Sequence, residues 1–344
     1  MLNYAIFGGI SFVLSLILTW LTKGIASRLN IVDVPGGERK LHDRAVPLLG
    51  GLGIFFAFWI VAGYLLFYNP IFEVNIFKTK LLGVFLAGAI LMVVGILDDK
   101  YNLSAKIRFP IIILSGVVAV LFGLGLGKIN NPFGGIISLG GIVAAGFGFV
   151  WLVAMMFTTK ILDGLDGLST GITLVGSLVI FFLTNTHKFF QPNVALLAII
   201  FGASCLGFLI FNFHPAKIFL GEGGSLFLGL MLGTLAIISG GKVATALLVM
   251  AIPFFDLLHV AYARWKKGRS IFKGDREHLH FKLVDMGLNH RSAVLLLYFF
   301  ALVFGVAALY LQSKGKILAL GFLIITIIVF NFLLAKNGRK IYEK

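Results

Sequence analysis

Acidic residues stand where apolar stretches end, in spacings that suit chemistry on phosphate groups. Asp98 and Asp99 are adjacent. Asp163 and Asp166 stand three residues apart, and Glu222 lies in a glycine-rich turn. Neighbouring carboxylates raise one another's proton affinity, so a pair can act as a base or hold a divalent cation. These acids are therefore the first candidates for catalytic or metal-binding residues.

Two of these motifs also allow a structural explanation. The adjacent acids could be a solvated helix end that Lys100 neutralises. In the second motif, Lys160 would share a helical face with both acids, whereas Gly164 and Gly167 would allow a broken helix and the close approach of a ligand. The turn Gly221–Ser225 precedes an apolar run, so it would present unpaired N–H groups and a helix dipole to a phosphate.

Basic and histidine side chains between the apolar runs are the second group of candidates. They are Lys40, His42, Lys106, Lys160, Arg276, His278 and His280. Basic loops beside a membrane are often topology anchors that contact anionic lipid, and two histidines two residues apart can bind a transition metal. The functional alternative is that these side chains contact phosphate oxygens.

The elements that must position these residues are membrane helices. Of 344 residues, 59% are hydrophobic and 12% are charged, and the mean hydropathy is +1.02, which excludes a water-soluble enzyme and a disordered chain. A single cysteine, Cys205, excludes a disulfide scaffold. Apolar runs of about 17–25 residues predict an all-α polytopic protein with eleven spans in one domain, 1–344. The spans are 4–22, 48–69, 81–97, 107–127, 143–157, 168–186, 193–211, 218–239, 241–262, 292–311 and 317–335.

The distribution of charge predicts the topology. When the first connection is assigned to side one and the sides alternate, side one holds 22 of the 29 lysines and arginines and side two holds 7. By the positive-inside rule side one is the cytoplasm, which puts the N-terminus outside and the C-terminus inside. Of 14 acids only Glu73 falls in an outside connection, so we expect a cytoplasmic site. The net charge of +15 then reflects topology rather than nucleic-acid binding, and the outside connection 130–141 could hold a short hairpin.

Acids, cations, histidines and a helix N-terminus beside one bilayer surface indicate phosphoryl transfer from a soluble phosphoanhydride to a membrane-held acceptor. The sequence has no Walker A motif and no dinucleotide fingerprint, which disfavours an ATP-driven pump. A secondary transporter is an alternative because Asp256 lies inside a span near Pro253. An inactive lipid-binding scaffold is another.

Five motifs, taken in order, resemble a known family. They are Arg39-Lys40-x-His42, Asp98-Asp99, Asp163-Gly164-x-Asp166-Gly167, Phe219-x-Gly221-Glu222 and Asp275-Arg276-x-His278-x-His280. Together they are similar to the motifs of the polyprenyl-phosphate N-acetylhexosamine-1-phosphate transferases of glycosyltransferase family 4. The segment Asp275–His280 is more similar to the WecA/TagO branch than to the MraY branch, which uses UDP-MurNAc-pentapeptide.

The resemblance implies a reaction and its partners. Undecaprenyl phosphate would attack the β-phosphorus of UDP-GlcNAc with Mg²⁺, releasing UMP, at the cytoplasmic face of a bacterial-type plasma membrane. The product would start a cell-envelope polysaccharide, and a homodimer is left open. An MraY-like transferase is the nearest alternative within the family.

The resemblance also implies a role for each candidate. Asp98 and Asp99 would be catalytic carboxylates, and Asp163 and Asp166 would line the nucleotide and metal pocket. Six residues would contact phosphate groups: Lys40, His42, Lys106, Arg276, His278 and His280. Of these, Lys40 and His42 would lie near the lipid phosphate.

Two residues depart from the family pattern at one place. Lys160 stands where the family usually has Asn, and Glu222 stands where it usually has Asp, and these two positions form the family's metal-contacting pair. Glu222 can still ligate a metal, but an ammonium has only donors. We therefore expect Lys160 to pair with Glu222 or Asp163, or to contact the diphosphate directly, unless the chain is an inactive homologue.

Overall fold

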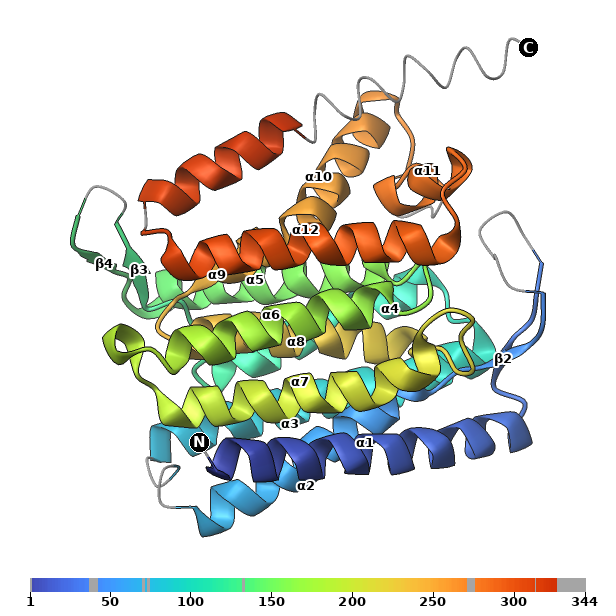
Figure 1. Cartoon of the computed structure of the whole chain (residues 1–344), viewed down its shortest axis with the longest axis horizontal. Coiled ribbons are helices and arrows are strands. Elements are labelled where there is room, and N and C mark those ends of the chain that lie inside the picture. The colour runs from blue at the N-terminus through green and yellow to red at the C-terminus, as the bar shows by residue number, and fades with distance from the viewer. Residues whose placement is uncertain are drawn as a thin grey trace.

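The computed structural model describes residues 2–36, 43–69, 72, 75–131, 134–270, 276–312 and 314–326. Long apolar helices dominate it, together with two small hairpins (Figure 1). The helices are α1 (Leu2–Arg28), α2 (Gly50–Tyr68), α3 (Asn75–Tyr101), α4 (Ala105–Leu121), α5 (Gly141–Leu162), α6 (Leu168–Thr184), the short η2 (His187–Phe189), α7 (Pro192–Asn212), α8 (Gly221–Ile238), α9 (Val243–Val249), α10 (Ala251–Lys266), α11 (Leu279–Asp285), α12 (His290–Tyr310) and a last helix over 314–326.

The helices are those of a multi-pass membrane protein. Within the described residues seven helices are long and apolar enough to cross a bilayer, or eight if the bent pair α9–α10 counts as one span. A helix or the bent pair coincides with each of the eleven predicted spans, but α4 and α6 have only 17 residues each, and the predicted last span continues beyond residue 326. Large apolar side chains such as Ile6, Ile10 and Val13 of α1 are exposed, as expected for a surface in contact with lipid.

The span predicted over 241–262 is not one continuous helix. The segment is divided into α9 and α10, whose axes are bent by 81°. Pro253 lies in the first turn of α10, where its ring would clash with the carbonyl of Val249 in a continuous helix. The bend turns α10 away from the helix bundle (Figure 1).

α8 is the central helix, and nearly all of its residues are buried against α2, α3, α5 and α6. Glycines allow two of these helices to approach it closely. A Cβ on Gly51 of α2 would lie 2.2 Å from Cα of Gly224, and a Cβ on Gly95 of α3 would lie 2.3 Å from N of Gly223. These glycines therefore serve helix packing, which brings the ends of α2 and α3 against the first turn of α8.

The helices alternate in direction, so their connections gather at two ends of the bundle. The β1–β2 ribbon (Val32–Asp33, Val46–Pro47) lies at one end, and the β3–β4 hairpin (Lys128–Asn130, Ile136–Ser138) lies at the other, on the right and left of Figure 1. The second hairpin overlaps the connection 130–141, for which the sequence allowed a short hairpin. At the first end, Phe219 N donates to Pro47 O at 2.8 Å and Gly50 N donates to Phe219 O at 2.9 Å, which ties the first connection to the start of α8.

Candidate active site

The end of α3 is joined to the start of α8 through Asp99. Its Oδ1 accepts the backbone N–H of Glu222 at 3.0 Å. Gly221 makes this approach possible: its φ is +78°, and a Cβ there would lie 2.3 Å from Oδ2 of Asp99. One N–H at the start of α8 is thus taken by a carboxylate, whereas the sequence suggested that it would be unpaired and open to a phosphate.

Glu222 is held between two cations. Its Oε1 forms an ion pair with Lys160 of α5, and its Oε2 lies 4.0 Å from Nη1 of Arg108 of α4. Arg108 also forms an ion pair of 3.2 Å with Oδ2 of Asp98. Of the alternatives expected for Lys160, this arrangement shows the pairing with Glu222, in which the ammonium neutralises the carboxylate.

Asp98 is buried, with 6% of its surface exposed. Its Oδ1 accepts no hydrogen bond from any described residue, while Oδ2 faces Arg108. A buried carboxylate oxygen without a donor is costly, so this atom marks a position where a ligand's donor or cation would be stabilised. The alternative of a solvated end paired with Lys100 does not fit this burial.

The second acidic motif forms a turn, as the broken-helix alternative expected. α5 ends at Leu162, Asp163 is its C-cap, and α6 begins after Gly167, whose φ is +80°. Burial raises the pKa of Asp163 to about 8, and the negative charges of Glu222, Asp166 and Asp99 raise it further in the same direction. Asp163 therefore holds a proton near neutral pH in the ligand-free protein.

Histidines from the last motif pack against this turn. A Cβ on Gly164 would lie 2.4 Å from Nε2 of His280, so glycine is required for the contact. His280 is buried, its Nε2 has no partner among the described residues, and burial lowers its pKa to about 3. It therefore acts as a neutral imidazole rather than as a cation.

Asp256 fixes the position of these histidines. Its Oδ2 lies 2.8 Å from Nδ1 of His278, and both of its oxygens accept the N–H of Leu279 at 3.2 Å. The rings of His278 and His280 lie nearly parallel, with their centroids 5.9 Å apart. The intramembrane acid on which the transporter alternative rested is thus fully engaged in holding the histidine motif.

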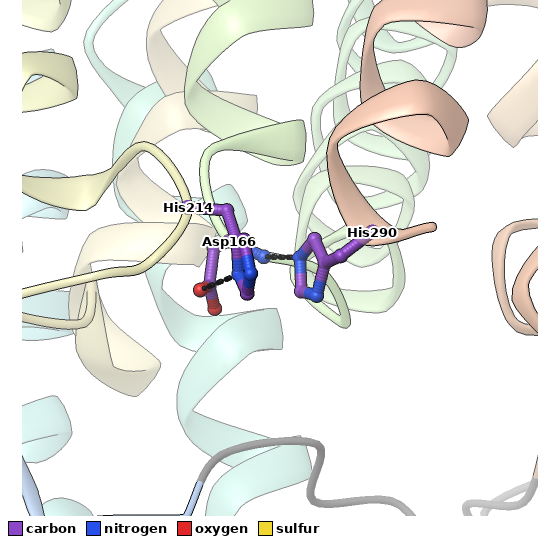
Figure 2. Close-up of side chains that lie close together, drawn as sticks. All are labelled: Asp166, His214 and His290. Atoms are coloured by element: carbon purple, nitrogen blue, oxygen red, sulfur yellow. Dashed lines mark hydrogen bonds and ion pairs between the residues drawn. The ribbon is translucent and has the colours of Figure 1, made fainter. Parts of the chain in front are cut away.

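Asp166 stands in a separate network with two histidines (Figure 2). Its Oδ2 lies 2.8 Å from Nδ1 of His214 and accepts the N–H of Ala216 at 3.0 Å. Its own N–H donates to Nε2 of His290 at 2.8 Å. Asp166, His214 and His290 have ligand atoms within 4.8 Å of one another, but the two rings stack at 4.1 Å with an angle of 18° between their planes. Ring lone pairs lie in the ring plane, so nearly parallel rings cannot direct both of them at one ion; the cluster holds the turn in place.

α7 and α12 also fasten the turn at Gly167. Its N–H donates to Oδ1 of Asn212 at 3.1 Å, and its carbonyl accepts the hydroxyl of Tyr298. These contacts join residues more than forty positions apart in the sequence.

The remaining candidates are placed less centrally. Lys106 is exposed in the first turn of α4, two residues before Arg108. Arg276 forms an ion pair with Asp285 and lies 5.2 Å from the ring of Phe281. Lys40 and His42 lie outside the described residues, as does Asp275.

Sequence reasoning did not place Arg108, His214, Asp256 and His290 in the transferase site. Arg108 stands in the basic stretch after the adjacent acids, and Asp256 is a lone acid in an apolar run, so both carried a signal. No sequence signal marked His214 or His290, because each lies in a connection next to a span, where a histidine is ordinary. Their contact with each other depends on the packing of α12.

The donor set at Glu222 can be tested against the magnesium that the resemblance implies. Magnesium takes oxygen ligands, but here an ammonium occupies Oε1 of Glu222 and a guanidinium lies near Oε2. Lys160 offers no lone pair. The residues present at this position do not fit a divalent cation bound by residues 160 and 222.

Comparisons with known proteins assign the family. The sequence profile of glycosyl transferase family 4 matches residues 81–240. A Bacillus subtilis (strain 168) protein named "Probable undecaprenyl-phosphate N-acetylglucosaminyl 1-phosphate transferase" is 34% identical over 342 residues, covering 97% of this chain and 92% of its own. The chain belongs to glycosyl transferase family 4.

Other members of glycosyl transferase family 4 agree with this assignment. A Mycobacterium tuberculosis (strain CDC 1551 / Oshkosh) protein named "Decaprenyl-phosphate N-acetylglucosaminephosphotransferase" is 32% identical over 85% of this chain and 80% of its own. An Escherichia coli (strain K12) protein named "Undecaprenyl-phosphate alpha-N-acetylglucosaminyl 1-phosphate transferase" is 27% identical over 83% of this chain and 78% of its own. The matched region of the profile contains Asp98, Asp163 and Glu222, which lie in the cluster described above.

Proposed function

We propose that this protein transfers N-acetylglucosamine 1-phosphate from UDP-GlcNAc to undecaprenyl phosphate. An oxygen of the lipid phosphate attacks the β-phosphorus of the nucleotide sugar, the bond between the two phosphates of the donor breaks, and UMP leaves. The observation that carries the proposal is that Asp98, Asp99 and Asp163 lie near Glu222, while the histidine motif packs on the 163–167 turn. The names of the three relatives describe the same reaction class in those proteins.

The arrangement supports transfer through position and charge. Phosphoryl transfer needs little covalent chemistry from the protein, so fixed charges and orientation supply most of the rate. Asp98 and Asp99 are the candidate catalytic carboxylates, each held by one specific donor. Asp163 would line the nucleotide pocket, and the neutral His280 would donate a hydrogen bond to a phosphate oxygen.

Lys160 takes a distinct role in the proposal. Because its ammonium holds Glu222, it supplies a fixed positive charge where the resemblance implies a metal contact. We expect turnover with EDTA to stay near its value without EDTA, and we expect Lys160→Asn to gain a requirement for Mg²⁺. Binding of Mn²⁺ to the wild type and to Lys160→Asn, measured by the paramagnetic resonance signal of the ion, gives a readout that does not depend on turnover. Strong loss of wild-type activity in EDTA would contradict this role for Lys160.

The proposal places the site at the cytoplasmic face of a bacterial-type plasma membrane, with eleven spans and the N-terminus outside. Its support is the excess of lysine and arginine in the connections at that end. Replacing Cys205 by serine and placing single cysteines in the β1–β2 and β3–β4 ribbons tests it. A membrane-impermeant thiol reagent applied to intact cells should label only the second ribbon; labelling of the first would reverse the topology.

The donor is tested with purified protein, undecaprenyl phosphate and three radiolabelled nucleotides. UDP-GlcNAc should yield a lipid-linked product, and UDP-GalNAc and UDP-MurNAc-pentapeptide should yield less. Product from UDP-MurNAc-pentapeptide alone would move the protein to the MraY-like branch. An Asp99→Asn variant is the control for contaminating enzymes.

A further inference from the structure

The end of the bundle opposite the acidic cluster carries unbalanced positive charge. Its connections contain seven lysines, no arginine and one acid, Glu73, which lies outside the described residues. Most lysines and arginines of the chain lie at the other end, so positive charge without matching acids is unexpected on this side. The lysines are Lys78, Lys80, Lys128, Lys188, Lys242, Lys314 and Lys316.

A cavity of about 480 Å³ opens at this end, between the β3–β4 hairpin and the loop after α8. Lys80 of α3 and Lys128 of β3 line it, and neither has an acidic partner among the described residues. Gly240 and Gly241 form another side; both have positive φ, and a Cβ on Gly241 would lie 2.2 Å from the carbonyl oxygen of Lys128. The shape of the cavity therefore depends on glycine at 241.

The cavity is apolar where it faces the helices. Val120, Leu126, Ile237 and Ile238 line it beside the two lysines. α4 ends at Leu121 and α8 ends at Ile238, so this apolar side lies where the two helices end. A ligand that fits both parts has an anionic head and an apolar body.

Positive charge is also buried next to the cavity. Lys242 follows Gly241, is 9% exposed, and holds its ammonium 3.7 Å from the ring centroid of Phe189. Burial lowers the pKa of Lys242, and repulsion from Lys188 lowers it further. Nearby, the ammonium of Lys316 donates to Oγ1 of Thr245 at 2.6 Å. A buried ammonium beside other cations is costly, and a nearby anion lowers that cost.

We propose that this cavity binds the phosphate head group of an anionic bilayer phospholipid, with Lys80 and Lys128 contacting the phosphate. The apolar part of the lipid nearest its head group contacts Val120 and Ile238 at the ends of α4 and α8. The site is separate from the transferase site and does not depend on the proposed reaction.

Native mass spectrometry of the full-length protein, titrated with phosphatidylglycerol, tests the proposal. Each lysine near an anionic lipid contributes about fivefold in affinity, so Lys80→Gln/Lys128→Gln should weaken the tightest lipid site about 25-fold. Lys128→Gln alone changes an exposed side chain and should weaken it about fivefold. The matched control, Lys78→Gln/Lys314→Gln, removes the same charge at the same end without changing the cavity lining, and should leave the affinity unchanged.

Three other outcomes would overturn the proposal. Equal weakening in the control variant would show attraction by general surface charge. Equal affinity for phosphatidylcholine, whose head group is neutral overall, would show that the lysines do not select the lipid. Displacement of the lipid by millimolar inorganic phosphate would show a site for free anions instead.

Discussion

Gly164→Ala should separate the histidine motif from the turn that carries Asp163. A Cβ at this position would lie 2.4 Å from Nε2 of His280 and 2.8 Å from Cζ of Phe281, whereas an ordinary contact begins near 3.4 Å. The histidine must therefore move by about 1 Å, and a displacement of that size near the reacting groups costs about 100-fold in rate. Gly164 does not have a positive φ, so the effect is steric rather than a result of backbone strain.

The assay for this variant is kcat for transfer from UDP-GlcNAc to undecaprenyl phosphate. Gly146→Ala is the matched control, because a Cβ on Gly146 meets no atom within 4 Å, and it should retain wild-type activity. Size-exclusion chromatography in detergent shows whether each variant is folded. A folded Gly164→Ala protein with near-normal kcat would refute the packing of the histidines against the acidic turn as a requirement for activity.

Three further results are expected from the same structure. Asp99→Asn and Asp163→Asn should each lower kcat by at least ~100-fold if both carboxyl groups carry charge in the transition state, which for Asp163 requires loss of its proton when substrate binds. Near-normal rates from both variants would remove these residues from the site. Because the pKa of Asp163 is raised to about 8, its contribution to stability is present below pH 4 and is lost as the pH rises through 8. The melting temperature of Asp163→Asn should therefore rise relative to that of the wild type between pH 5 and pH 8.5. A constant difference between the two melting temperatures would contradict the raised pKa. Tyr298→Phe removes the hydrogen bond to Gly167 and should lower the melting temperature by about 2–4 °C, while Tyr262→Phe, which alters an exposed ring, should not.

The positions of the helices could be predicted from the sequence because long apolar runs indicate them, whereas within the described residues only seven or eight meet the length and hydropathy of a span. The 81° bend between α9 and α10 was missed, although Pro253 was visible, because a proline inside an apolar run can also kink a helix only slightly. The broken helix at 163–167 was one of two alternatives, and the glycines could not decide between them without the packing of α12 on Gly167.

The residues of the site could be predicted where acids, cations or histidines stand next to apolar runs, because such side chains are unusual there. The pairing of Lys160 with Glu222 was expected because an ammonium and a carboxylate replace the family's usual side chains at one place. The network of Asp166 with His214 and His290 could not be predicted, since it joins three segments that are distant in the sequence. The glycines at 223 and 224 suggested a phosphate site, but they allow helices to cross.

The fate of each phosphate of the donor tests the proposed reaction most directly. With UDP-GlcNAc labelled at the β-phosphorus, the label should appear in the lipid product, and with the label at the α-phosphorus it should appear in UMP. Release of β-labelled UDP would show that the sugar alone is transferred, and release of the β-label as free N-acetylglucosamine 1-phosphate would show hydrolysis of the donor by water. Either result would contradict transfer of a sugar phosphate at this site.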